Sequence, residues 1–302
     1  MSKKLYFDCT TGISGDMIVA GLIDAGADTD KLQKVMDDLK TKVGGFEIKI
    51  SEVQKSAIRA MDFDVVLDED NHDHDMEYLY GHLHHDEEHH HEHNHHEHEH
   101  NHHHEDHHHE DHHHEGHHHD HHHDHHHVHR SLSDVIDIIN QADITDGARE
   151  LAIKVFTIIA EAEAAVHGRT IEEVHFHEVG AIDSIVDIIA AAVCFDDIVT
   201  REGIGEIIIP KVVDGSGTIR CQHGILPVPV PAVLKIVEQT GLPISITERQ
   251  GEFVTPTGAA FAAAVASEYK LPDSFRVLKT GLGAGKRDYE VPGILRVMEI
   301  EC

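Results

Sequence analysis

The amino-acid sequence predicts an α+β fold, in which a mixed sheet packs against helices and a disordered, histidine-rich insert interrupts the chain. Short segments of alternating polar and apolar residues are typical of strands, and longer segments with apolar residues every three or four positions are typical of helices. The two kinds of segment follow one another without the even spacing of a repeat fold. The insert, 68–129, is a stretch of low complexity that holds 32 of the 36 histidines.

The segment before the insert, 1–67, is predicted to form an N-terminal α/β unit. "KLYFD" (4–8) indicates a buried strand, and the glycine turn "TTGISGD" leads into a helix that closes at Gly26. "DKLQKVMDDLK" indicates a second, amphipathic helix, which ends at the glycine pair 44–45. The residues from "FEIKI" to "DVVL" follow as strands, because polar and apolar side chains alternate.

The insert is expected to be disordered without metal, because it has too few apolar side chains to offset the entropy lost on ordering. Neutral imidazole is a good ligand for Ni, Cu, Zn and Co, so repeated histidine triplets with carboxylates between them indicate multivalent metal binding. A solubilising spacer or a purification tag is the alternative, although the tract is internal and irregular. The predicted tract ligands include His107, His108, His109, His112, His113 and His114.

The segment after the insert, 130–302, is predicted to form an α+β domain. Helices are expected at "SLSDVIDIINQADI", with Ser131 or Ser133 as N-cap, at "DGARELAIKVFTIIAEAEAAVHG" and at "SIVDIIAAAVCFDDIV". "GEIIIPKVV", "DGSG" and "TIRCQHG" indicate a hairpin, followed by the extended run "LPVPVP". A helix at "AVLKIVEQTG", a strand at "ISITE", a helix at "TGAAFAAAVASEY" and strands at "FRVLKTGLG" and "GILRVMEIE" complete the chain.

The charge of the chain favours cations as partners. The formal net charge is −32, from 56 acidic and 24 basic side chains, which argues against binding to nucleic acid or to anionic membranes. No apolar run reaches the roughly 18 residues of a membrane-spanning helix, and no signal peptide is recognised. The four cysteines form no Cys-x-x-Cys pair. We therefore expect a cytoplasmic protein with free thiols.

The stretch "VHFHEVGAIDSIVDI" (174–188) carries the first candidate site. In an extended segment His175 and His177 project from one face, and Glu178 follows them. Asp183 and Asp187 are four residues apart on the next helix and therefore share a side. These five residues are predicted metal ligands, and His177 and Glu178 are also candidate catalytic residues. The alternative is that Asp183 caps the helix and Asp187 interacts with its positive end.

Three glycine-containing segments are candidates for holding a phosphate. In "FDCTTGISGDM", Gly12, Ser14 and Gly15 form a turn whose N–H groups can bind an anion, and Asp8 is a further candidate metal ligand. The alternative is an ordinary turn in which Ser14 or Asp16 caps the helix.

The other two segments are "FVTPTGAA" and "KTGLGAGKRDY". The first offers Thr257, the expected N-cap, with Gly258, and the second offers Lys286 beside Arg287. Neither segment matches a Walker A loop or a dinucleotide fingerprint. "CQHG" places Cys221 two residues from an imidazole, although a structural cysteine is the commoner outcome.

Five motifs in this order resemble one family: "GISGDM", a histidine-rich insert before "RSLSDVIDII", "EEVHFHEVGAIDSIVDI", "HGILPVPVPA" and "TPTGAA". The chain is similar to the nickel-insertion proteins of nickel-pincer nucleotide biosynthesis. The resemblance implies a lyase- or chelatase-like cyclometallase that inserts Ni(II) into pyridinium-3,5-bisthiocarboxylic acid mononucleotide. The product has a carbon–nickel bond between two sulfur ligands and is the cofactor of lactate racemase.

The resemblance also implies CTP, with Mn or Mg, bound by a further C-terminal domain. The chain ends where that domain is expected to begin, so we expect the N-terminal part, with the remainder possible as a separately encoded fragment. Loss of the ring proton requires a base, for which His177 or Glu178 is the candidate. The sequence does not determine the oligomeric state, and a homo-oligomer is compatible with it.

Other functions explain fewer features of the sequence. A non-enzymatic nickel or cobalt store or metallochaperone would explain the histidine tract but leave the ordered motifs unused. A metal-dependent hydrolase ranks last, because only His167 and His223 lie outside the tract and the "HFH" motif. A nickel GTPase chaperone is disfavoured by the missing P-loop.

Overall fold

The computed structural model describes residues 2–68, 130–176, 182–221 and 223–302. The predicted histidine-rich insert, apart from Asp68, lies outside the described residues, and so do the candidate residues His177 and Glu178. The described residues belong to one compact unit. They contain seven helices and a mixed sheet of six strands, which confirms the predicted α+β class.

The main sheet has the strand order β2-β3-β11-β12-β1-β6. β1 runs antiparallel to β12 and parallel to β6, and β11 runs antiparallel to β12 and parallel to β3. Because strands from both sides of the insert alternate in this order, segments 1–67 and 130–302 share one sheet. The strands are β1 (Lys3–Asp8), β2 (Phe46–Lys55), β3 (Ile58–Leu67), β6 (Glu206–Ile208), β11 (Arg276–Ala284) and β12 (Ile294–Glu301).

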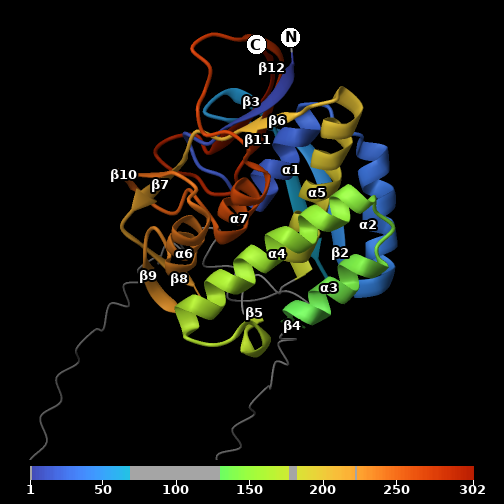
Figure 1. Cartoon of the computed structure of the whole chain (residues 1–302), viewed down its shortest axis with the longest axis vertical. Helices are drawn as coiled ribbons and strands as arrows, with labels where there is room; N and C mark the ends of the chain where they lie inside the picture. The colour runs from blue at the N-terminus through green and yellow to red at the C-terminus, as the bar shows by residue number, and fades with distance from the viewer. Residues whose placement is uncertain (1, 69–129, 177–181, 222) are drawn as a thin grey trace, which may run out of the picture. The chain divides into compact units, whose positions relative to one another are not determined.

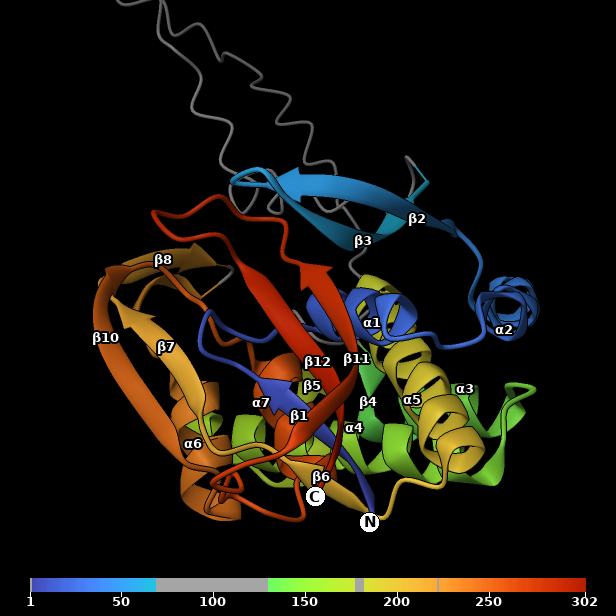
Figure 2. The same ribbon diagram turned by 90° about the horizontal axis from the view of Figure 1, so that it is seen from above.

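The helices lie mainly on one side of this sheet, with α1 against β3 and β11, α5 against α1, and α4 against α5 (Figures 1 and 2). α6 and α7 also contact α4. The rings of Phe7 on β1 and Phe261 on α7 lie 6.0 Å apart, which joins α7 to the sheet. The helices are α1 (Gly15–Asp24), α2 (Thr29–Val43), α3 (Leu132–Gln141), α4 (Asp146–His167), α5 (Ile182–Glu202), α6 (Pro231–Thr240) and α7 (Pro256–Val265).

Local signals in the sequence explain where these helices begin and end. Ser131, and not Ser133, is the N-cap of α3, and it forms a capping box with Asp134. α4 ends at Gly168, which has a left-handed backbone with φ of 63°, a conformation that glycine adopts without steric cost. The apolar residues 188–194 are buried in α5.

The predicted hairpin over 205–224 is wrong. β6 joins the main sheet, whereas β7 (Val212–Ser216) pairs in parallel with β10 (Ile244–Gln250). The hairpin in this region is formed by β8 (Thr218–Cys221) and β9 (Gly224–Pro227). Pro210 separates β6 from β7, and proline cannot donate a ladder hydrogen bond, so one apolar run is divided between two sheets.

Two short elements connect the helices near the candidate site. β4 (Arg130–Ser131) pairs antiparallel with β5 (His175–Phe176), so His175 is in register with Ser131. The 3-10 helix η3 (Ile171–Glu173) precedes β5. Arg130 follows the insert directly, so β4 brings the chain back to the residues that lead into α5.

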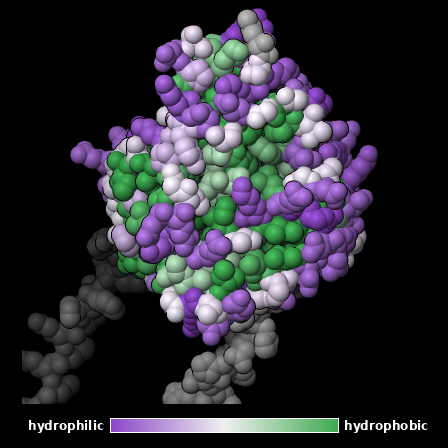
Figure 3. Space-filling model, viewed as in Figure 1, coloured by the Kyte–Doolittle hydropathy of each residue, from purple (hydrophilic) through white to green (hydrophobic). Residues whose placement is uncertain are grey.

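The surface and the cysteines agree with the composition. Figure 3 shows apolar residues near the centre of one face, with hydrophilic residues around them. Within the described ranges, no helix combines the length and the apolar character needed to cross a bilayer. All four cysteines are free thiols: Cys9 and Cys194 are buried, Cys221 is partly exposed and Cys302 is exposed.

Candidate functional site

A cavity of about 380 Å³ lies where four helices begin. Its walls include the first residues or N-caps of α1, α5, α6 and α7, together with β3, the β8–β9 hairpin and the loop after β11. Helix N-termini carry partial positive charge and N–H groups that lack an acceptor within the helix. The cavity is large enough for a small organic ligand, and its helix ends favour an anionic one.

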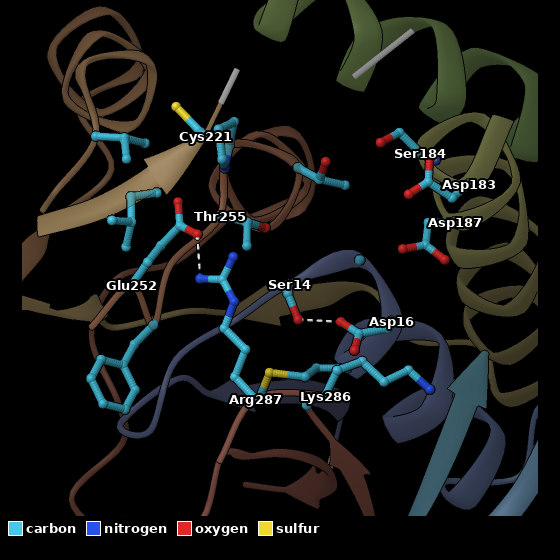
Figure 4. Close-up of a pocket in the computed structure, with 18 of the residues that line it drawn as sticks. Ser14, Asp16, Asp183, Ser184, Asp187, Cys221, Glu252, Thr255, Lys286 and Arg287 are labelled. Atoms are coloured by element: carbon cyan, nitrogen blue, oxygen red, sulfur yellow. Dashed lines mark hydrogen bonds and ion pairs between the residues drawn. The ribbon is translucent and has the colours of Figure 1, made fainter. Parts of the chain in front are cut away.

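Two carboxylates, Asp16 on α1 and Asp187 on α5, stand on one wall of the cavity (Figure 4). Burial raises the pKa of Asp16, although a hydrogen bond from the Ser14 hydroxyl and the charge of Lys286 oppose that change. The pKa of Asp187 lies well above its ordinary value, because of burial and because Asp16 and Asp183 are negatively charged neighbours. Like charges in such a pair disfavour double ionisation, so the pair retains a proton to higher pH than an exposed carboxyl.

Gly15 lets this pair form. A Cβ atom at Gly15 would lie 2.6 Å from Oδ2 of Asp187 and 3.0 Å from its Cβ. Real Cβ atoms do not approach so closely, so only glycine allows the start of α1 to reach α5 here. Gly15 and Ser14, two of the residues predicted to bind an anion, line the cavity, and Gly15 makes room there for a carboxylate.

Lys286 and Arg287 are sequence neighbours whose side chains turn to different walls (Figure 4). Lys286 Nζ lies 2.9 Å from both carboxylate oxygens of Asp62 and 3.2 Å from Oδ1 of Asp64. Burial lowers the pKa of Lys286, but the two β3 carboxylates raise it further, so the net change is upward. Lys286, a predicted phosphate ligand, lines the cavity, but its charge is already balanced by the β3 carboxylates.

Arg287 reaches the opposite wall. Its Nη1 donates to Oε2 of Glu252 at 2.8 Å and to the hydroxyl of Tyr289 at 3.2 Å. The Tyr289 hydroxyl in turn donates to the carbonyl oxygen of Glu252 at 2.8 Å. The rings of Tyr289 and Phe253 lie 4.4 Å apart, so the arginine belongs to a packed network.

Two of the predicted anion-binding glycines serve packing. Gly12 has a φ of 101°, and a Cβ there would lie 2.3 Å from the carbonyl oxygen of Phe253. A Cβ at Gly258 would lie 2.1 Å from the carbonyl oxygen of Ile13. Neither glycine lines the cavity, but both allow the loop before α1 to lie against the start of α7, where Ile13 N–H donates to Phe253 at 2.8 Å.

The N-cap of α7 is Thr255, so the expectation that Thr257 fills this role is wrong. The Thr255 hydroxyl accepts the N–H of Gly258 at 3.2 Å, and Pro256 occupies the first helical position. Proline at that position is compatible with a helix start, because its missing N–H would have no helical acceptor. Thr257 still lines the cavity, one position inside the helix.

The predicted metal ligands are only partly brought together. Asp183 and Asp187 lie on one side of α5, as their spacing predicted, and both line the cavity. Asp8 is buried, forms an ion pair with Arg296 on β12 and is not part of the cavity wall. Within the part of the chain that the structure describes, no three His, Cys, Asp or Glu side chains are arranged to hold a metal ion.

The sequence matches the family model for the nickel insertion protein over residues 5–301. This chain belongs to the nickel insertion protein family. It is 45% identical over 302 residues to the pyridinium-3,5-bisthiocarboxylic acid mononucleotide nickel insertion protein of Alkaliphilus metalliredigens, covering 100% of the chain and 61% of that relative. The relative of the same description from Clostridium acetobutylicum is 42% identical over 298 residues, which cover 98% of the chain and 63% of that protein.

A nickel insertion protein from Geobacillus kaustophilus, with the same description, is 35% identical over 297 residues, 98% of this chain and 59% of its own length. The chain therefore spans about three fifths of the length of these relatives. No solved structure matches it significantly.

Two residues of the site, Asp16 and Glu252, are not recognisable from the sequence in the positions that the structure gives them. The sequence indicates Asp16 only as a helix cap, whereas the structure places it in the first turn of α1, at the cavity wall. Glu252 is an isolated glutamate in a loop, and such a residue carries no local signal in the sequence. Only the fold brings Glu252 to Arg287, 35 residues further along the chain.

Proposed function

We propose that this chain forms the part of a nickel insertion enzyme in which Ni(II) enters pyridinium-3,5-bisthiocarboxylic acid mononucleotide. The product would be the nickel-pincer nucleotide used by lactate racemase. Family membership and the names of the relatives support the substrate and the metal. The observation that carries the proposal is the Asp16–Asp187 pair, whose raised pKa values occur at the wall of a cavity suited to a small organic anion.

The reaction makes a specific demand on the protein. A ring carbon–hydrogen bond is broken, a carbon–nickel bond is formed, nickel remains divalent, and one proton leaves the ring. A base must accept that proton, and a base works best when its pKa is close to the working pH. Asp187 meets this requirement better than an exposed carboxylate, since burial and its negative neighbours raise its pKa. We assign the proton to the Asp16–Asp187 pair.

The nickel is a substrate, and its ligands before transfer are proposed to be those predicted from the sequence apart from Asp8, which is not part of the cavity wall, and Asp187, which is assigned to the base. His175, His177 and Glu178 precede α5, and Asp183 lies in its first turn, at the cavity wall. Histidine and carboxylate donors suit Ni(II). The histidine-rich insert is proposed to concentrate nickel, and we expect it to supply the metal without taking part in bond formation.

The remaining features of the proposal come from the family resemblance. CTP, with Mn or Mg, is proposed to act through a region outside residues 1–302, and no described residue is assigned to it. The reaction is of the lyase or chelatase-like type, and the expected location is cytoplasmic. A non-enzymatic nickel store is the alternative, but a store has no need for a proton-accepting pair inside a cavity.

The test is a product assay. The chain, alone and mixed with the remaining C-terminal portion of the Alkaliphilus metalliredigens relative, is incubated with Ni(II), CTP, Mg²⁺ and the bisthiocarboxylic acid mononucleotide. Mass spectrometry is expected to show the nickel-containing nucleotide. A nickel store would bind the metal stoichiometrically and leave the nucleotide unchanged in both mixtures, and that result would refute the proposal.

Deletion of the histidine-rich insert distinguishes a role in nickel supply from a role in the insertion reaction. Removal of residues 69–129 is expected to leave the initial rate unchanged in saturating nickel and to lower it when nickel is limiting. Loss of product at saturating nickel would show instead that the insert takes part in the reaction.

A further inference from the structure

Among the described residues, Lys286 and Arg287 are the cations at the cavity, and Arg287 is the one with N–H groups open to a ligand. Lys286 is surrounded by Asp62 and Asp64, which together exceed its charge. Arg287 meets one carboxylate, that of Glu252, and does so through Nη1 alone. Resting on the proposed function, we propose that Arg287 and the N-terminus of α7 form the binding site for the phosphomonoester group of the mononucleotide.

The open edge of Arg287 is the first argument. A guanidinium has five N–H groups, and an edge formed by Nε and one terminal nitrogen can hold two oxygens of a phosphate in parallel. Within the described ranges, Nη1 makes the protein contacts, while Nε and Nη2 have no protein acceptor. The side chain is 25% exposed, and Figure 4 shows it reaching into the cavity in the direction of Thr255.

The start of α7 supplies a second donor. Thr255 takes the N–H of Gly258, and Pro256 has no N–H, so Thr257 carries the remaining N–H of the first turn. No acceptor within the described residues receives that N–H. Thr257 lines the cavity with Arg287. A helix N-terminus with an available N–H and a guanidinium with free N–H donors together favour the binding of a dianion.

The surroundings hold these donors in place before a ligand arrives. Tyr289 packs on Phe253 and bonds to the Glu252 backbone, which fixes the loop facing Arg287. Asp214 is fully buried, and its Oδ1 accepts the N–H groups of Phe253 at 2.8 Å and Val254 at 3.1 Å. Because this segment leads directly into α7, the arginine and the helix start form a pre-organised pair, which lowers the entropy lost on binding.

The position of the phosphate follows from the charges of the two walls. The wall with Asp16 and Asp187 repels a dianion, and the Lys286 charge beside it is already neutralised by β3. A phosphate bound at Arg287 leaves the pyridinium ring to extend toward the carboxylate pair. This arrangement would place a proton acceptor near the ring and keep the phosphate away from it.

The experiment compares a pyridinium nucleotide with and without its phosphate. Nicotinamide mononucleotide and nicotinamide riboside are titrated calorimetrically into the chain. We expect the mononucleotide to bind about tenfold to a hundredfold more tightly, the usual worth of hydrogen bonds to a charged group. Arg287→Ala should remove this preference, and Arg287→Lys, which keeps the charge but loses the two-pronged edge, should retain only part of it.

Matched variants decide between this site and its alternatives. Arg276→Ala removes an arginine that is ion-paired with Glu301 outside the cavity and should keep the full preference. Melting curves of each variant establish that it is folded. Equal binding of the two compounds, no measurable binding of the mononucleotide, or a preference lost in Lys286→Ala but kept in Arg287→Ala would each overturn the inference.

The phosphate site and the insertion reaction can be refuted separately, although the first is argued from the second. Nickel insertion without a phosphate preference would refute the phosphate site alone. A phosphate preference that depends on Arg287, in a protein that forms no nickel-containing product with the complementing C-terminal portion, would refute the insertion reaction alone.

Discussion

On the α1–α5 side of the cavity, Asp16 and Asp187 are partly buried neighbours, and the charge of Lys286 only partly opposes the rise in their pKa values. On the opposite side, the side chains of Glu252 and Arg287 are 6% and 25% exposed, and they form an ion pair at 2.8 Å. The first arrangement destabilises the charged form of a carboxyl and so prepares it to exchange a proton. The second preserves charge and leaves part of the guanidinium for a ligand. The same cavity thus separates proton transfer from anion recognition.

The difference shows why residue type alone does not identify a role. Lys286 and Arg287 have the same charge and adjacent positions, yet β3 carboxylates neutralise the lysine and one glutamate orients the arginine. Each of the following experiments alters one wall and leaves the other as a control.

The largest effect is expected from Asp187→Asn. Removal of the proposed base should lower the rate of nickel insertion by at least about a hundredfold, the lower end for loss of a positioned base. The rate is measured as nickel-containing nucleotide formed per minute in the complemented assay. Asp37→Asn, an exposed change on α2, is the matched control and should have no effect. An Asp187→Asn rate within a few-fold of the unmodified chain would exclude Asp187 as the base.

The pH dependence sharpens this result. The ionised base accumulates only as pH rises through the raised pKa of Asp187, so the rate should increase with pH along an acid limb. Asp16→Asn removes a negative neighbour, so it should lower the pKa of Asp187 and move that limb to lower pH. An acid limb that stays in place would mean that the two carboxyls are not coupled.

The next effect is steric. Gly15→Ala places a methyl group 2.6 Å from Asp187 Oδ2, and the required displacement should reduce the free energy of unfolding by about 1–3 kcal/mol, as overpacking usually does. The rate of insertion should fall as well, because Asp187 moves. Gly205→Ala is the matched control: no atom lies within 4 Å of its Cβ position, so urea denaturation should show little change.

Asp187→Asn is expected to have a smaller effect on the free energy of unfolding than Gly15→Ala, and to raise it. Asp187 ionises near 3.8 when unfolded but keeps its proton to higher pH when folded, so the free energy of unfolding falls as pH rises through that interval. Asp187→Asn should therefore stabilise the fold at neutral pH. The expected gain in unfolding free energy is about 1 kcal/mol, which is typical of single stabilising substitutions. At pH 3 the gain should disappear, because both states are then protonated. A loss of stability at neutral pH would contradict the raised pKa.

The smallest effect distinguishes the two threonines at the start of α7. Thr255→Ala should cost about 1 kcal/mol of unfolding free energy, because the N-cap hydrogen bond to Gly258 is lost. Thr257→Ala should cost only a few tenths of a kcal/mol, since Thr257 is not the cap. Equal losses in thermal denaturation would show that the cap is shared.

Much of this fold could be predicted from the sequence because its signals are local. The glycines at the ends of α2 and α4, the serine cap of α3 and the apolar run of α5 depend on residues within one or two turns. The spacing of Asp183 and Asp187 likewise placed both on one side of a helix before any partner was known. For the same reason, the α+β class and the family resemblance could be derived from the order of short motifs.

The tertiary structure alone decided which distant residues meet. The run at 206–213 satisfies strand periodicity with any partner, and only the fold assigns β6 to β1 and β7 to β10. Asp16 becomes a candidate acid–base group only when α5 lies beside α1, and Arg287 becomes an anion site only when Glu252 occupies one of its edges. Local conformation depends on neighbours along the chain, whereas pKa values and open hydrogen-bond donors depend on neighbours in space.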